Sequence, residues 1–211
     1  MWNFTKNEIL RLGDDRLVLG HRLSEWCGHA PILEEDIALA NIALDLIGQA
    51  AAFLELVGDP DQLAYFRDPM DFRNCLLVEQ PNRDFAFTIA RQFLFDAYSV
   101  PLLESLDLDI AKKAVKESRY HLRHSTEWTL RLGDGTEESH NRIQRAFDEL
   151  WQFTDELRSP AWDETVNTVF KSATVQRPAD TGILHARHTE HLGHMLAEMQ
   201  SLARSIPGAQ W

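Results

Sequence analysis

Apolar residues recur at every third or fourth position over most of the chain, which is the spacing of one buried face of an α-helix. The pattern is interrupted at Gly28 and Pro31, at Gly58 and at Gly133, where we expect helices to end. The predicted helices cover residues 6–26, 31–57 and 62–66, a stretch that starts at Asp84, residues 109–132, a stretch capped by Thr136, and residues 163–171 and 183–205. The alternation typical of strands is missing.

Several of these predicted helices are long, and short breaks join them. Long helices with short connections pack antiparallel to their neighbours in a bundle. No shift in composition marks a domain boundary along the chain. The sequence therefore predicts an all-α fold, a four-helix bundle with additional helices, in a single domain over residues 1–211.

The charge and the cysteine content of the chain exclude several classes of binding partner and site. The chain has 211 residues, a formal net charge of −12 and a pI near 5.1. Such an acidic balance argues against binding to a nucleic-acid backbone or to an anionic membrane surface. Two cysteines are too few for a disulfide framework, and no uninterrupted apolar run approaches the ~18 residues of a membrane span. We expect a soluble cytoplasmic protein that binds neither nucleic acid nor membrane.

Polar residues interrupt the apolar faces of four predicted helices. Glu117, His121 and His124 share one stripe of their helix because they are spaced by four and three positions. The inward candidates are His21, Glu25, Asp45, Gln92, Asp96, Glu117, His121 and His124. Carboxylates and histidines from four facing helices are the material of a diiron carboxylate site.

The spacing of these residues does not complete such a site. A diiron site needs a Glu-x-x-His pair on each of two helices. Asp45 is followed at the histidine position by Gly48, and Glu117 by Tyr120, while His121 and His124 lack the carboxylate. We interpret these residues, together with Gly48 and Tyr120 at the two histidine positions, as a degenerate metal site. It is a polar core without metal or catalytic residues, in which Glu117 and His121 hydrogen-bond with Asp96 or Asp45.

Four histidines follow one another at every third position near the end of the chain. They are His185, His188, His191 and His194. Steps of three positions turn each side chain about 60° around a helix, so the four imidazoles do not converge on one metal. We interpret them as a polar helix face or as donors between subunits.

Seven stretches carry a resemblance to a known family. They are Leu19–His29, Leu33–Gln49, Phe72–Asn82, Ile89–Asp96, Lys116–Ser125, Arg131–His140 and Arg187–Gly193. Together they resemble the C-subunit family of the bacterial phenylacetyl-CoA 1,2-epoxidase complexes. The resemblance covers residues 5–156 and 183–211, and the connection from Leu157 to Ile183 is shorter than is usual in that family.

The resemblance implies a ferritin-like fold and a part in aerobic phenylacetate degradation. Complexes of this kind epoxidise the aromatic ring of phenylacetyl-CoA with oxygen and with reducing equivalents from NADPH. Their diiron centre lies in a separate, homologous catalytic subunit. The resemblance therefore implies a structural subunit of a multicomponent monooxygenase that is not catalytic by itself and has no cofactor of its own. Its expected partners are the diiron subunit and the other subunits, and the isolated chain can pair as a homodimer.

Two other functions stay open from the sequence. One is a diiron carboxylate oxygenase with an altered ligand set, built from Glu25, Asp45, Asp96, Glu117, His121 and His124. The other is a separate helical module that binds an acyl-CoA or another apolar ligand. Gly48 disfavours the first because it has no ligand atom, and the acidic composition disfavours the second because nucleotide phosphates need basic partners.

Overall fold

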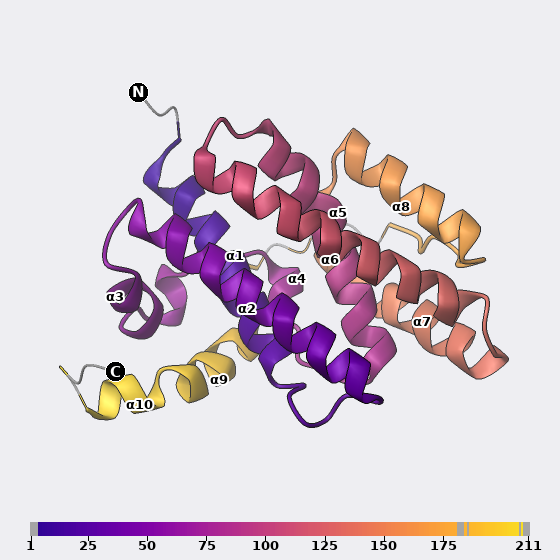
Figure 1. Cartoon of the computed structure of the whole chain (residues 1–211), viewed down its shortest axis with the longest axis horizontal. Helices are drawn as coiled ribbons and strands as arrows, with labels where there is room; N and C mark the ends of the chain where they lie inside the picture. Colours follow the sequence, from indigo (N-terminus) through magenta and orange to yellow (C-terminus); the bar gives the residue numbers. More distant parts are fainter. Residues whose placement is uncertain (1–3, 181–183, 185, 207, 209–211) are drawn as a thin grey trace. The chain divides into compact units, whose positions relative to one another are not determined.

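The computed structural model of the chain describes residues 4–180, 184, 186–206 and 208, and all regular secondary structure in that part is helical (Figure 1). The elements are α1 (Lys6–Ser24), α2 (Leu33–Glu55), α3 (Pro60–Tyr65), η1 (Pro69–Asp71), α4 (Leu76–Glu79), α5 (Phe85–Ser105), α6 (Asp109–Gly133), α7 (Glu137–Leu150), η2 (Trp151–Phe153), η3 (Asp155–Leu157), α8 (Pro160–Ser172), α9 (Glu190–Met199) and α10 (Ser201–Ser205). The all-α fold is confirmed, and it is consistent with a ferritin-like helical fold.

The chain divides into two compact units. Unit 1 consists of Met1–Pro81 and Ala186–Trp211, and unit 2 is Asn82–His185. The single domain over residues 1–211 and its four-helix bundle stay predictions.

Helix starts follow local chemistry that can be read in the sequence. Thr5 and Thr136 each form a reciprocal capping box with the residue three positions later, at the starts of α1 and α7. The Asp84 side chain accepts from the Phe87 N–H and so caps α5, which begins one residue later than expected, at Phe85. Ser159 caps α8 in the same way, and this helix starts three positions before the predicted Asp163.

Unit 1 is built on the pair α1 and α2, which run antiparallel along most of their length (Figure 1). Two glycines on α1 allow the close approach. A Cβ atom on Gly13 would lie 2.7 Å from the Leu54 side chain, and one on Gly20 would lie 3.2 Å from the Ala43 carbonyl oxygen. Leu19, Leu39 and other apolar residues fill the interface. Hydrophobic burial together with this close backbone packing holds the pair.

Helix α2 also satisfies a simple test for a membrane span. Among the described residues it is the one helix long and apolar enough to cross a bilayer by length and composition. One such helix is weak evidence, because the core helix of a soluble protein satisfies the same test.

Unit 2 is built on α5 and α6, with α7 and α8 also packed on α5. Its core is aromatic. The Phe147 and Phe170 rings lie 4.5 Å apart between centroids, and the Trp151 and Trp162 rings lie 5.6 Å apart. The buried Trp162 indole donates to the Leu94 carbonyl at 2.9 Å, which satisfies its polar atom.

The last predicted helix, residues 183–205, is wrong in its extent. Ile183 and His185 lie outside the described residues, and the described helix starts only at Glu190 and breaks at Gln200 into α9 and α10. The physical reason lies just before Glu190. His188 and the Thr189 N–H are bonded to Glu79, so this stretch is extended rather than helical.

Candidate functional site

Asp96 lies at the centre of a buried polar cluster in unit 2. Gln92, one turn earlier on α5, donates from Nε2 to Asp96 Oδ1 at 2.8 Å. The Ser125 hydroxyl, on α6, lies 3.1 Å from Asp96 Oδ2 and 3.0 Å from the His121 carbonyl oxygen. All four residues are buried. The predicted inward positions of Gln92, Asp96 and His121 are thus confirmed, and the cluster joins α5 to α6.

Ser125 is a member of this cluster that the sequence did not single out. It follows His121 by four positions and therefore lies on the same face of α6. This spacing was the available signal. A serine hydroxyl has one proton, so Ser125 shares that proton between the Asp96 carboxylate and the His121 carbonyl.

Three of the predicted core residues lie on the surface instead. The Tyr120 side chain is 45% exposed, and Gly48 is exposed, with no atom within 4 Å of a Cβ built on it. Glu25 is exposed at the C-cap of α1, where it pairs with Arg22 at 3.0 Å. The correction has a geometric cause. Neighbouring helical residues point about 100° apart, so Tyr120 turns outward when His121 turns inward.

Asp45, Glu117 and His124 are half-buried. Their expected network, in which Glu117 and His121 hydrogen-bond with Asp96 or Asp45, stays a prediction. The bonds described at Asp96 come from Gln92 and Ser125.

The donor atoms do not fit a diiron centre. Within the described part of the chain, no group of three or more His, Cys, Asp or Glu side chains could hold a metal ion. A diiron site needs carboxylates and imidazoles converging from four helices. Gly48 supplies no ligand atom, and the Tyr120 side chain is largely in solvent.

A second buried cluster surrounds Glu79 in unit 1. The carboxylate is fully buried and accepts four hydrogen bonds. Asn74 Nδ2 and His188 Nδ1 lie 2.9 and 2.6 Å from Oε1, while the Thr189 N–H and hydroxyl lie 2.6 and 2.7 Å from Oε2. Arg22 donates to the Glu79 carbonyl oxygen at 2.9 Å. Glu79 thereby fixes the chain just before α9 to α4.

In the histidine series, His188 has described hydrogen-bond partners at both ring nitrogens. Its Nδ1 lies 2.6 Å from the Glu79 carboxylate and its Nε2 lies 3.1 Å from the Phe72 carbonyl oxygen. Both ring nitrogens therefore face hydrogen-bond acceptors within unit 1, and the ring joins two segments of the chain. His191 is half-buried, His194 is exposed, and His185 lies outside the described residues.

Two further buried acids lie on α1. Asp14 is ion-paired with Arg67 and accepts from the Arg73 N–H at 2.9 Å, while Asp15 accepts from the Cys75 N–H at 2.7 Å. Burial raises the pKa of Asp14, and the Arg67 guanidinium opposes this shift. The sequence carried one unused signal for this site, since two consecutive acids stand inside the apolar pattern of this helix.

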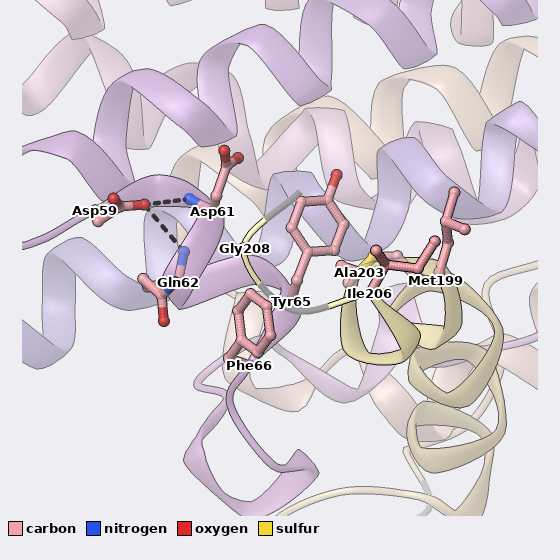
Figure 2. Close-up of a pocket in the computed structure, with 10 residues that line it drawn as sticks. Asp59, Asp61, Gln62, Tyr65, Phe66, Met199, Ala203, Ile206 and Gly208 are labelled. Carbon is pink, nitrogen blue, oxygen red and sulfur yellow. Dashed lines mark hydrogen bonds between the residues drawn. The ribbon is translucent and has the colours of Figure 1, made fainter. Parts of the chain in front are cut away.

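Unit 1 also has an open pocket of about 680 Å³ between α3 and the last helices (Figure 2). Its lining residues are Asp59, Asp61, Gln62, Tyr65, Phe66, Met199, Leu202, Ala203, Ile206 and Gly208. Asp59 caps α3 by accepting from the Asp61 and Gln62 N–H groups. The lining has two acids and no basic side chain, so it does not suit the phosphates of an acyl-CoA.

Similarity to known proteins extends over almost the whole chain. The sequence model of a family described as "Phenylacetic acid catabolic protein" matches residues 4–161 and 154–211. The chain belongs to this family. One relative is the C subunit of the 1,2-phenylacetyl-CoA epoxidase of Escherichia coli (strain K12), which is 48% identical over 240 aligned positions that cover 96% of this chain and 97% of the relative. The resemblance inferred from the seven stretches is confirmed.

The alignment with the relative also allows a comparison of chain length, which concerns the connection after Leu157. The alignment spans 240 positions, whereas this chain has 211 residues, so the relative has residues without a counterpart here. The two matches to the family meet at residues 154–161. Part of the shorter stretch folds as α8, whose Val166 and Phe170 are buried.

Proposed function

We propose that this chain is a structural subunit of a multicomponent phenylacetyl-CoA 1,2-epoxidase in aerobic phenylacetate degradation, and that it supports a homologous diiron catalytic subunit. The observation that carries the proposal is the 48% identity to the C subunit of the Escherichia coli epoxidase over nearly the whole of both chains. Similarity of this extent covers the helices of both units rather than one motif.

In this proposal the chain binds no iron and contributes no catalytic residue. Gly48 and the exposed Tyr120 at the two histidine positions support this part. The bonding of Asp96 supports it too, because both of its carboxylate oxygens already accept hydrogen bonds. These bonds hold the carboxylate between Gln92 and Ser125.

The proposed partners are the diiron subunit and the remaining subunits of the complex, and the proposed location is the cytoplasm. The net charge of −12 supports a soluble protein partner over nucleic acid or an anionic membrane. The proposal also includes a homodimer of the isolated chain when its partner is absent.

Co-expression tests the proposal directly. The diiron subunit is produced with and without this chain, and the oxygen- and NADPH-dependent conversion of phenylacetyl-CoA is measured with the reductase present. We expect the diiron subunit to lose solubility or turnover when this chain is missing. Equal solubility and equal turnover without the chain would show that it is not a required structural subunit.

Iron content separates this function from the alternative, a diiron oxygenase with altered ligands. The alternative is favoured by one observation, the burial of Asp96 and His121 on neighbouring helices. After anaerobic Fe(II) loading, the purified chain is expected to hold well under one iron per chain. Two irons with a carboxylate-bridged spectrum, lost in Asp96→Asn, would establish the alternative.

A further inference from the structure

Helix α2 exposes a line of large apolar side chains. Leu33 is 72% exposed, Ile37 54%, Leu44 67% and Ile47 39%. Their spacings of four, seven and three positions place them on one face of the helix. We call these four residues, with the intervening Ala40 and the following Gly48 and Ala51, the α2 stripe. Single exposed apolar residues are normal, but a contiguous line of them marks an interaction surface.

The opposite face of α2 already has its partner. Leu39, Ile42, Leu46 and Phe53 are buried, and α2 packs on α1 within unit 1. Helix α2 is thus apolar on two sides, although only one side is used inside the unit. A helix that is apolar all round is normally buried all round. The α2 stripe is therefore an apolar surface that no described element of the chain buries, although its composition is typical of a buried helix face.

The C-terminal end of the α2 stripe is small, because Gly48 and Ala51 follow Ile47 there. A Cβ atom on Gly48 would meet nothing within 4 Å, so the glycine is not required by packing inside the chain. Glycine in the middle of a helix destabilises it by roughly 0.5–1 kcal/mol relative to alanine. Small residues at this end of the stripe allow the backbone of a second helix to come close.

The charges on α2 indicate which kind of partner can bind the stripe. Besides the buried Glu35, the helix carries Glu34, Asp36, Asp45 and Glu55, and it has no Lys or Arg. A second copy packed antiparallel would place the acids at one end of α2 against Glu55 of the other copy, with Asp45 near Asp45. Like charges face to face are unfavourable, and an anionic lipid surface meets the same objection. A helix with basic residues beside an apolar face complements the charges of α2.

Resting on the proposed function, we infer that the α2 stripe is the docking face for an apolar helix of the diiron catalytic subunit, a helix flanked by Lys or Arg. From Leu33 to Ala51 the stripe is about 27 Å long, which matches about five turns of a partner helix. A stable complex buries about 1,200–2,000 Å² in total. The stripe supplies the apolar centre of such an interface, and the acids of α2 supply part of its rim.

Leu44→Glu is the first test of this docking face. The variant and the unchanged chain are each titrated with the purified diiron subunit, and the dissociation constants are compared. Because Leu44 is exposed, the isolated variant is expected to keep its helix content and melting temperature. A charge at the centre of the interface should weaken binding about 30-fold or more. Leu202→Glu on α10, a leucine that is 56% exposed, is the matched control and should change binding by less than about threefold.

Gly48→Gln is a second variant, and a loss of binding in this variant cannot be attributed to misfolding. It fills open space and replaces a poor helix former, so the isolated chain should melt at a higher temperature. The same side chain blocks close approach of a partner helix, so the complex should weaken about tenfold. Opposite signs for stability and binding are the expected signature, and an unchanged dissociation constant contradicts the inference.

Reversal of charge tests the second half of the inference. Glu34→Lys together with Glu55→Lys should weaken binding at low salt, and the difference should shrink in 1 M salt because the charges are then screened. Equal binding by the charge-reversed and unchanged chains at low salt contradicts a partner with basic flanks.

The remaining outcomes separate this inference from the proposed function. If the unchanged chain binds the diiron subunit and Leu44→Glu binds it equally well, the docking face is wrong while the proposed function stands. If Leu44→Glu breaks a homodimer but leaves the complex intact, a second copy occupies the stripe and the inference is overturned. If the unchanged chain forms no complex with the diiron subunit, the proposed function itself fails.

Discussion

Buried acids in the two units are used in different ways. In unit 1, Asp14, Asp15 and Glu79 are fully buried, and each accepts from backbone N–H groups of a distant, irregular stretch. In unit 2, Asp96 lies between two regular helices, and its described donors are the side chains of Gln92 and Ser125. The difference follows from the backbone nearby, since irregular stretches have N–H groups that no helix satisfies.

The buried acids of unit 1 therefore have a different structural role from Asp96, which occupies a position expected for a metal ligand. The acids of unit 1 replace missing backbone hydrogen bonds, so their removal should weaken folding directly. The described donors of Asp96 are side chains, and the backbone of a helix pair with apolar residues there would still be fully hydrogen-bonded. We therefore expect larger losses of stability from unit 1 than from unit 2.

The largest effect is expected for Glu79→Ala. Removal of this carboxylate leaves His188, Asn74 and the Thr189 N–H without their buried acceptor. Breaking such a buried charged network costs about 3–5 kcal/mol of unfolding free energy, which urea denaturation measures. Glu79→Gln keeps the shape and one acceptor and serves as the control, with a smaller loss. A loss below about 1 kcal/mol for Glu79→Ala would remove the distinction between the units.

A smaller loss, about 1–3 kcal/mol, is expected for Asp96→Ala. Gln92 loses its acceptor, whereas Ser125 keeps the His121 carbonyl, which limits the loss. Ser125→Ala is the partner variant for a double-mutant cycle, and residues in contact couple by about 0.5–3 kcal/mol. A loss for Asp96→Ala larger than that for Glu79→Ala would reverse the comparison.

The smallest effect concerns acid sensitivity in unit 1. Burial lowers the pKa of His21, and Glu25 and Glu198 only partly offset this shift. Below the ordinary value of 6.5 the unfolded chain takes up this proton more readily than the folded one, so stability falls as the pH drops from 6.5 through the lowered pKa. His21→Gln should reduce the fall in melting temperature between pH 7.5 and pH 5.5 by about 1–2 °C. An identical fall in both proteins contradicts the assignment.

Much of the fold was predictable because helix formation is local. The first helix ends two residues before the predicted Trp26, and the fourth long helix ends one residue after the predicted Leu132. Ile143 and Phe147 are buried as their spacing indicates. The helix around Glu190 was misplaced because its start depends on Glu79, more than a hundred positions earlier.

The candidate site was predictable only in part. Helical periodicity identified Gln92, Asp96 and His121, since one face of a helix can be derived from spacing. The spacing of a Glu-x-x-His pair wrongly placed Tyr120 in the core as well, although Tyr120 directly precedes the inward-facing His121 and so points away from it. The exposure of the α2 stripe could not be predicted for a related reason. Spacing identifies the apolar faces of a helix, but it does not show which of them a neighbouring element buries.

The sequence by itself determined the long helices of residues 6–150, the Thr136 cap and the family, because backbone hydrogen bonds, capping and motif similarity depend on residues close together in the chain. Only the tertiary structure decided which polar groups are partners. Glu79 takes its donors from positions 5, 109 and 110 residues away, and Asp14 takes its arginine from 53 positions away. The free energy of a buried carboxylate depends on the donors around it, and these are brought together only when distant segments fold against one another.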